Sequence, residues 1–573
     1  MEKNVKIFFA CFFLFVLFFA LGTRTPNEHR RGFFSDESSY FSIIQSLAYD
    51  YDIKYTREDI VRIKERFPTG PVGVYLKRGA DGRITYAKPF LYPLFSAPFF
   101  RIFDTNGILL FNGLMLFFSA LMGYLLLKQY YPSARSLSFT LIFLFSSVTW
   151  IYTWWMTSDL FNFFTLFAAL FFFFYHFRNR NWFYLSGVSF TVFILSKPTN
   201  AAPVAIIFLI LLYRKEWKRF ILLSLVCLLL LSGLVLFYYV QSGELTVKLY
   251  YGGDRTAFFG QYPFERPEYK FESPGKTTMD DYLERMYLTP KVVVLNLFYY
   301  FFGRFTGMFI YFFPAFFLLV AFFFREKVPE DWFILAAIGL SILIACILFS
   351  ADSYFGGSGS VGNRYFLNIF PFFFFLGFRK RKFTFPYVPV LAAVILLSPT
   401  FMDALFYSYR PRMAGIGFPV KYFPVEKTQY LHLPTNENPR ARNLDVGGKY
   451  HIYFINDNFH LLENERFWTI GDNQLELLLL APEKVRIFEV TLTNSPLKNR
   501  VVCRIENKTQ RVGMGPRDQK TLVFENIDGL KVSRGYLYHI KVKSSGSYCP
   551  YFEEENSEDR RILGVNVHIE LVK

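Results

Sequence analysis

Long apolar runs recur along most of the chain and constrain its fold more than any other feature. Runs such as Ile7–Gly22, Phe220–Val240 and Trp332–Ser350 are long enough, at about 1.5 Å per residue, to cross a hydrocarbon layer of about 30 Å. A helix satisfies its backbone hydrogen bonds within one segment, as a lipid-facing backbone must. The composition agrees, since 53% of the 573 residues are hydrophobic. The sequence therefore predicts a mainly α-helical, multi-pass membrane protein.

About eleven spans are predicted, some of them shorter than the usual length of about 20 residues. They are Ile7–Gly22, Ile108–Leu127, Leu137–Tyr152, Leu160–Phe177, Trp182–Ser196, Ala201–Tyr213, Phe220–Val240, Met308–Phe324, Trp332–Ser350, Tyr365–Phe378 and Val388–Phe406. Phe90–Phe103 is short and contains two prolines, so we expect an interfacial or re-entrant segment there. Val292–Phe302 is also short and is expected to lie along the surface.

The positions of lysine and arginine support this count. With a cytoplasmic N-terminus, every predicted inner loop is basic, whereas the short outer turns contain only Lys197 and Arg364. Cytoplasmic loops of membrane proteins are enriched in these cations, so the net charge of +17 reflects topology and does not indicate nucleic-acid binding. The loops 24–88 and 241–290 and the chain after Phe406 are thus predicted on the outer face.

The composition changes at about Thr428, where alternating apolar and polar stretches begin. These are His451–Ile455, Leu475–Leu480, Val485–Leu492, Val501–Ile505, Leu522–Phe524, Tyr536–Val542 and Val565–Val572. Strands of this kind between turn residues predict an all-β sandwich, jelly-roll-like in character. We therefore divide the chain into a membrane domain, 1–410, and an outer β domain, 428–573. The sequence leaves open whether Cys503 and Cys549 form a disulfide there.

The first outer loop has internal order. Asp36 and Glu37 precede apolar residues at helical spacing between Tyr40 and Ala48, which predicts an amphipathic helix lying in the membrane interface. Thr56 and Asp59 form a capping-box pattern for a second helix that ends at Arg66. The second outer loop, 241–290, lacks periodicity, and we expect it to be a mobile lid.

Ionisable residues are nearly absent from the predicted spans. Ion-coupled transport usually requires charged groups near the middle of the membrane, so their absence argues against that class of function. Polar residues gather instead at the outer ends of the helices. They are Asp36, Glu37, Lys88, Asp159, Lys197, Asp352, Asn363 and Arg364.

These residue types suit chemistry on a phosphate-linked substrate, but each also has a structural interpretation. Carboxylates serve as general bases or metal ligands, and a planar guanidinium fits phosphate. Acids are equally favoured at a helix start, which would explain Asp36 and Asp159, and a lysine such as Lys197 can extend to the membrane surface. The residues alone leave both interpretations open.

The combination of motifs resembles the GT-C superfamily of integral-membrane glycosyltransferases, in particular the protein mannosyltransferase and lipid A aminoarabinose transferase type. The resemblance is carried by the carboxylates after the first span, Tyr86–Pro93, Lys197–Thr199 and Gly362–Tyr365. It extends over the membrane domain. The tail is similar to jelly-roll domains attached to some bacterial members.

The resemblance implies a role for each residue. Asp36 would be the catalytic base and Glu37 its neighbour or a substrate contact, while Asp159 would line the cavity. The residues implied in binding the donor and its phosphate are Lys88, Lys197, Asn363 and Arg364. No metal ligand is assigned, and a requirement for a divalent cation stays open.

The implied donor is a polyprenyl-phosphate sugar that enters from the membrane lipid. The acceptor would be a hydroxyl of a glycolipid, a glycan or a protein, at the outer face of a bacterial cytoplasmic membrane. Two alternatives remain: a lipid-linked-sugar flippase or glycan-binding transporter, which would form no glycosidic bond, and an O-antigen ligase or polymerase, which would use a diphosphate donor.

Overall fold

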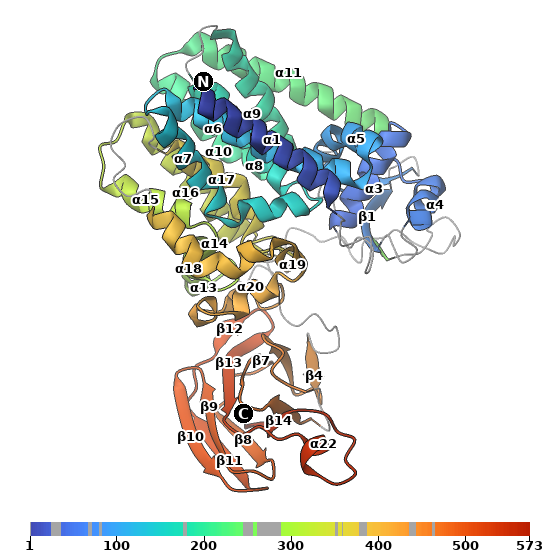
Figure 1. Ribbon diagram of the computed structural model, residues 1–573, viewed down its shortest axis with the longest axis vertical. Helices are drawn as coiled ribbons and strands as arrows, with labels where there is room; N and C mark the ends of the chain where they lie inside the picture. Colours follow the sequence, from blue (N-terminus) through green and yellow to red (C-terminus); the bar gives the residue numbers. More distant parts are fainter. Residues whose placement is uncertain are drawn as a thin grey trace.

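The protein consists of an N-terminal helical domain followed by a C-terminal β domain (Figure 1). The computed structural model describes residues 2–23, 36–66, 72–78, 83–175, 180–243, 256–259, 288–349, 353–357, 359–376, 387–434, 443–460 and 465–572. The helices, drawn in blue to yellow, form one body, and the strands drawn in orange and red form the other. Predicted site residue Asp352 lies outside the described residues.

Four helices are long and apolar enough to cross a membrane. They are α1 (Lys3–Gly22), α6 (Thr105–Lys128), α11 (Trp217–Ser242) and α16 (Pro329–Leu348). Along α11 only three residues are buried, and leucines such as Leu228 and Leu229 are largely exposed. An exposed apolar surface of this size is stable in contact with lipid and not with water. The helical domain is therefore a membrane domain.

The remaining helices of this domain are shorter. They are α7 (Ser133–Phe145), η1 (Val148–Trp154), α8 (Asp159–Phe174), η2 (Arg180–Tyr184), α9 (Leu185–Ser196), η3 (Pro198–Asn200), α10 (Ala201–Tyr213), α13 (Pro290–Phe302), α14 (Met308–Tyr311), α15 (Phe313–Phe323), α17 (Arg364–Phe375), α18 (Val388–Met402), α19 (Ala404–Tyr409), α20 (Arg412–Ile416), η4 (Val420–Tyr422) and η5 (Lys427–Gln429).

The eleven predicted spans are not confirmed by helix length and composition. The described residues provide four such helices, or five if the bent pair α7 and η1 counts as one span. This pair corresponds to the predicted span Leu137–Tyr152, and its two parts meet at 65°. The bend falls at Ser146 and Ser147, where the Ser147 hydroxyl accepts a hydrogen bond from Thr149 N and so competes with the helical backbone.

The first outer loop folds into α3 (Asp36–Tyr49), α4 (Arg57–Arg66) and, after two strands, α5 (Leu91–Phe103). The capping box of α4 is confirmed, because Asp59 Oδ2 accepts hydrogen bonds from Thr56 N at 2.9 Å and Thr56 Oγ1 at 3.0 Å. The interfacial placement of α3 is wrong. Every residue from Ser38 to Ala48 is buried, since α5 and strand β1 pack against this helix.

Three short strands join the two outer loops. Strand β1 (Val72–Arg78) pairs with β2 (Ile84–Tyr86) on one side and with β3 (Thr256–Phe259) on the other, all antiparallel. The sequence analysis predicted helices but no strand in this region. A mobile lid was expected at 241–290. Within this loop, Thr256–Phe259 instead forms the edge strand of the sheet. Residues 244–255 and 260–287 lie outside the described residues.

The C-terminal β domain is confirmed as a sandwich of two antiparallel sheets. One sheet has the order β10-β9-β13-β7-β5-β4, with β12 paired to β13, and the other has the order β11-β8-β14-β6. Apolar residues of both sheets form one core, as expected for a jelly-roll-like domain. The strands are β4 (Leu444–Val446), β5 (Tyr450–Phe454), β6 (Phe467–Ile470), β7 (Gln474–Ala481), β8 (Ile487–Asn494), β9 (Asn499–Ile505), β10 (Lys508–Met514), β11 (Gln519–Glu525), β12 (Leu530–Val532), β13 (Gly535–Ser544) and β14 (Leu563–Val572).

All seven predicted stretches correspond to strands of this domain. The sequence analysis missed β4, β6, β10 and β12, which are short or, in β10, mostly polar and exposed. Helix α22 (Pro550–Glu553) precedes the last strand. Cys503 and Cys549 are both free thiols, so the disulfide left open by the sequence does not form in this structure.

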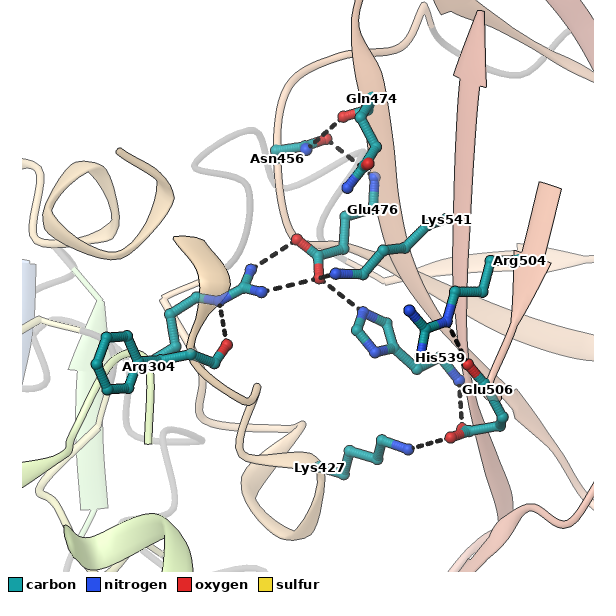
Figure 2. Close-up of polar contacts among 10 residues, drawn as sticks. Arg304, Lys427, Asn456, Gln474, Glu476, Arg504, Glu506, His539 and Lys541 are labelled. Atoms are coloured by element: carbon teal, nitrogen blue, oxygen red, sulfur yellow. Dashed lines mark hydrogen bonds and ion pairs between the residues drawn. The ribbon is translucent and has the colours of Figure 1, made fainter. Parts of the chain in front are cut away.

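The two domains meet across the outer face of the larger sheet. Leu478, Leu480 and Leu537 on this face belong to the same apolar cluster as the membrane domain. Beside them, Arg304 of the membrane domain donates two hydrogen bonds to Glu476, at 2.6 and 3.0 Å (Figure 2). Arg304 is 2% exposed and Glu476 is 4% exposed. A buried, bidentate ion pair therefore fixes how the domains are joined.

Further groups complete this junction, as Figure 2 shows. His539 Nε2 and Lys541 Nζ both contact Glu476 Oε1, at 2.7 and 3.0 Å. Burial raises the pKa of Glu476, but hydrogen bonds and the charge of Arg304 hold it well below the usual range of a glutamate. Burial lowers the pKa of His539, so a neutral imidazole can donate to this carboxylate.

A second carboxyl, Glu426, lies buried in the connecting segment. Its Oε1 accepts hydrogen bonds from Phe305 N and Thr306 N, both at 2.8 Å, and from Thr306 Oγ1 at 2.9 Å. Its Oε2 is buried and has no partner among the described residues. Burial raises the pKa of Glu426 to about 7, although the hydrogen bonds from Phe305 and Thr306 oppose this effect.

Candidate active site

Asp36 stands at the centre of a cluster of charged side chains. It is the first residue of α3, and its two carboxylate oxygens contact different cations. Lys88 Nζ lies 2.7 Å from Oδ1, and Arg364 Nη2 lies 2.8 Å from Oδ2. Burial raises the pKa of Asp36, but the charges of Lys88 and Arg364 hold it well below its usual range. In this state Asp36 is an ionised carboxylate and a weak base.

Lys88 reaches Asp36 from the turn between β2 and α5. Only 9% of the residue is exposed, and its Nζ lies 4.3 Å from the centroid of the Tyr75 ring on β1. An aromatic face attracts a cation, so Tyr75 helps to hold the ammonium group away from water. The strands between the two loops thus position the first of the two cations.

Arg364 is held by the start of α17 and the glycine-rich loop before it. Asn363 caps this helix, since its Oδ1 accepts a hydrogen bond from Phe366 N at 2.9 Å. Gly356 has a φ of +91°, and a Cβ added there would lie 2.1 Å from Arg364 Nε. That Nε is buried and, in the described part of the chain, has no hydrogen-bond partner. The guanidinium therefore retains a donor for a ligand.

Asp159 lies on the other side of Arg364. Its Oδ2 accepts a hydrogen bond from Thr157 Oγ1 at 2.8 Å and lies 3.9 Å from Arg364 Nη1. Asp159 begins α8, but its carboxylate faces the charged cluster and is 5% exposed as a residue. Arg364 consequently bridges two carboxylates that are far apart in the sequence.

The structural interpretation of Lys197 supposed a lysine that extends to the membrane surface. The structure shows instead a buried side chain. It is 9% exposed, and its Nζ lies 3.2 Å from the centroid of the Tyr365 ring and 4.9 Å from that of Phe349. No described carboxylate lies within ion-pair distance of it. Burial lowers the pKa of Lys197 to about 7, although the charge of Asp159 opposes this effect.

The structure separates Glu37 from its neighbour. Glu37 Oε1 accepts a hydrogen bond from Met156 N at 3.4 Å, and it makes no ion pair with Lys88 or Arg364. Asp36, Lys88, Asp159 and Arg364 form the charged cluster itself. Lys197 lies beside this cluster, because Lys197 and Arg364 both contact the Tyr365 ring. Asn363 caps the helix that begins at Arg364, and Glu37 contacts the segment before α8.

Sequence reasoning missed two residues that support this cluster, Tyr75 and Thr157, which contact Lys88 and Asp159. Tyr365 belongs to the motif Gly362–Tyr365, and Gly356 begins the glycine-rich stretch before Arg364, where it makes room for that side chain. Within the described ranges, no group of three or more potential ligands could hold a metal ion.

The comparisons with known proteins are distant. No protein-family model and no curated protein matches the chain. The structure is similar to that of ArnT from Cupriavidus metallidurans bound to undecaprenyl phosphate, with 15% sequence identity and a TM-score of 0.40 over 73% of this chain and 70% of that chain.

It is also similar to the oligosaccharyltransferase of Archaeoglobus fulgidus. The apo form gives 12% identity and a TM-score of 0.37, over 70% of this chain and 55% of that chain. A complex of AglB with an inhibitory peptide and a dolichol-phosphate gives 11% sequence identity and a TM-score of 0.34, over 71% of this chain and 56% of that chain. The aminoarabinose transferase type that the sequence resembles thus reappears among the structural neighbours. At these TM-scores the likeness is too distant to assign an activity, which has to be inferred from the site.

Proposed function

We propose that the protein is a membrane glycosyltransferase that moves a sugar from a polyprenyl-phosphate donor to a hydroxyl acceptor. The observation that carries the proposal is the pairing of Asp36 with Lys88 and Arg364 at 2.7 and 2.8 Å. One carboxylate held between the buried Lys88 and the partly buried Arg364 supplies both a base and a site for a phosphate. A glycosyl transfer with a phosphate leaving group needs these two elements and no nucleotide site.

The resting ion pairs explain how the base would be activated. A donor phosphate that binds Lys88 and Arg364 replaces the Asp36 carboxylate as their counter-ion. The pKa of Asp36 then rises from its depressed value, because the cations that lowered it are neutralised by the phosphate. Asp36 becomes a competent base only when the donor is bound, which limits wasteful reaction with other groups.

The chemical step follows from this arrangement. Asp36 accepts the proton of the acceptor hydroxyl while its oxygen attacks the anomeric carbon of the sugar. The bond between this carbon and the phosphate oxygen breaks, and the electron pair leaves with the phosphate. Because the hydroxyl attacks in line, from the face opposite the phosphate, the configuration inverts. Lys88, Arg364 and Lys197 would stabilise the charge on the departing phosphate. The buried Nε of Arg364, unpartnered among the described residues, gives that phosphate one further donor.

The other predicted residues would position these groups. Asp159 orients Arg364 from the side opposite Asp36, and Asn363 fixes the start of α17. Glu37 anchors α3 against the segment before α8. We place this site at the outer face of a bacterial cytoplasmic membrane, with the N-terminus in the cytoplasm, as the loop charges indicate. The acceptor would be a glycolipid, a glycan or a protein.

Transfer of a radiolabelled sugar by the purified full chain in detergent tests this function. Short polyprenyl-phosphate and polyprenyl-diphosphate sugars serve as the two donors, with total cell-envelope extract as the acceptor. The proposal expects transfer from the monophosphate and at least tenfold slower transfer for Arg364→Ala. Transfer from the diphosphate alone would favour a ligase or polymerase. In proteoliposomes, movement of the intact donor across the bilayer without a new glycosidic bond would favour a flippase.

A further inference from the structure

A cavity in the β domain is lined by residues that do not belong to the charged cluster around Asp36. It has a volume of about 270 Å³ and opens beside the hairpin of β4 and β5. Side chains from this hairpin, from β7 and from the β12–β13 turn line it, among them Lys449, His451, Tyr453, Leu480, Pro482 and Arg534.

The strand pattern explains why polar and apolar groups meet here. Along β5, Tyr450 and Ile452 point into the sandwich core, whereas His451 and Tyr453 alternate onto the outer face of the sheet. Leu480 of β7 pairs with His451, and the chain then leaves the sheet at Pro482. The lining of the cavity therefore combines apolar and aromatic side chains with nitrogen groups.

Several of these nitrogen groups lack partners. His451 Nδ1 is buried and has no hydrogen-bond partner among the described residues. Arg534 makes no ion pair within the described part of the chain, and its charge opposes the rise that burial produces in the pKa of Tyr453. Among the described residues that line the cavity there is no aspartate or glutamate, although Glu465 lies 3.3 Å from the Nζ of the lining residue Lys449. A buried donor or acceptor without a partner costs about 1–3 kcal/mol, so a ligand that satisfies it would be favoured.

We propose that this cavity binds an anionic sugar unit, a single ring that carries a phosphate or a carboxylate. Arg534 provides the positive charge, since Lys449 is already paired with Glu465 at 3.3 Å, and a guanidinium can bind either anion through two parallel hydrogen bonds. Exposed Pro482, together with the small exposed edges of Tyr453 and Leu480 (4% and 3% exposed), contacts the apolar face of the sugar ring, while His451 meets a ring hydroxyl. The volume lies just below the range of about 300–1,000 Å³ for drug-sized ligands, which fits one ring and excludes a long oligosaccharide.

Binding to the purified full chain in detergent tests this proposal without any transfer reaction, so it can fail independently of the proposed function. The probes are glucose 1-phosphate, glucuronate, glucose and inorganic phosphate, each titrated by calorimetry. We expect one or both anionic sugars to bind at least tenfold more tightly than glucose or inorganic phosphate. The stronger of the two identifies the anion. Equal binding of glucose, or equal binding of inorganic phosphate, would overturn the proposal.

Variants locate the site. Arg534→Gln and His451→Ala should each weaken binding of the anionic sugar at least tenfold. Lys484→Ala, an exposed lysine in the turn after β7, is the matched control and should leave binding unchanged. Arg364→Ala should also leave it unchanged, because this residue belongs to the charged cluster in the membrane domain. Binding that survives Arg534→Gln or disappears with Arg364→Ala would place the ligand elsewhere and contradict the proposal.

Discussion

The buried ion pair between Arg304 and Glu476 makes an asymmetric prediction about domain stability. Arg304→Met removes two charge-assisted hydrogen bonds to Glu476, each worth about 1.5–3 kcal/mol, and a third bond from Nε to the Phe423 carbonyl. Glu476 would still contact His539 and Lys541, so its charge remains compensated and the loss falls at the lower end, about 3 kcal/mol. Glu476→Met instead leaves a cation that is 2% exposed and whose side chain, among the described residues, keeps only the Phe423 carbonyl as acceptor.

An uncompensated buried charge costs about 3–5 kcal/mol, and we expect the upper end for Glu476→Met. The double variant Arg304→Met/Glu476→Met should cost less than the sum of the two single changes by at least about 1 kcal/mol, because neither charge is then left alone. The order of the three variants, with Glu476→Met the least stable, is the specific outcome of the geometry.

Cys503 provides a reporter for the β domain. It is fully buried in the sandwich core and reacts with a maleimide only when this domain opens. A urea titration in detergent, with pulse labelling of Cys503 read by mass spectrometry, gives the free energy of opening. The control Lys484→Met breaks an exposed pair with Asp528 and should cost less than about 1 kcal/mol. If Arg304→Met costs no more than this control, or if the double variant is additive, the reasoning is refuted.

Two further predictions concern the backbone before Arg364 and the buried carboxyl Glu426. Gly356→Ala would place a Cβ 2.1 Å from Arg364 Nε and should lower kcat about 10²-fold, whereas Gly357→Ala, at a similar φ of +93° but with no atom within 4 Å, should stay within a few-fold of the wild type. Equal losses would show that strain and not the clash matters. Glu426 has a pKa of about 7 in the native state and an ordinary pKa of 4.5 in the unfolded chain. Between pH 4.5 and 7 the native state therefore binds more protons than the unfolded state. The free energy of unfolding should therefore fall by about 3 kcal/mol as pH rises from 4.5 to about 7, and Glu426→Gln should abolish this fall in parallel melting curves; an unchanged fall would contradict it.

The sequence predicted the β domain well because its signal is local. Alternation in stretches such as Leu475–Leu480 and Val565–Val572 reports directly which face of a strand is buried. The helix at Asp36 was also predicted, but its placement was wrong. The spacing of its apolar residues indicated that one face of the helix is buried. It could not show that α5 and β1 also pack against this helix and bury its polar face.

The charged cluster was predicted as a set of residues and not as a set of contacts. Asp36 and Arg364 are separated by 328 positions, so their ion pair depends on the packing of the whole membrane domain. The resemblance assigned Lys88 and Arg364 to the donor phosphate, and in the structure both cations contact Asp36. Arg304 and Glu476 were missed for the same reason, because neither residue lies in a motif and each acquires its role only at the domain junction.

The number of spans is the part of the fold that stays a prediction. Apolar content identifies a segment that avoids water, but not whether it runs straight through the membrane. Pro371 within α17 and Pro399 within α18 are tolerated, and α7 breaks at its serines. A count by composition alone cannot include such breaks, because they arise where neighbouring helices satisfy the freed backbone groups.

The most direct test of the central claim is the effect of Asp36→Asn on sugar transfer from a polyprenyl-phosphate donor. The change keeps the size of the side chain and removes the base, so kcat should fall about 10²–10⁴-fold while the donor still binds to Lys88 and Arg364. Asp50→Asn, just beyond the other end of α3, should leave kcat unchanged. If Asp36→Asn transfers sugar within a few-fold of the wild-type rate, Asp36 is not the base and the account is wrong.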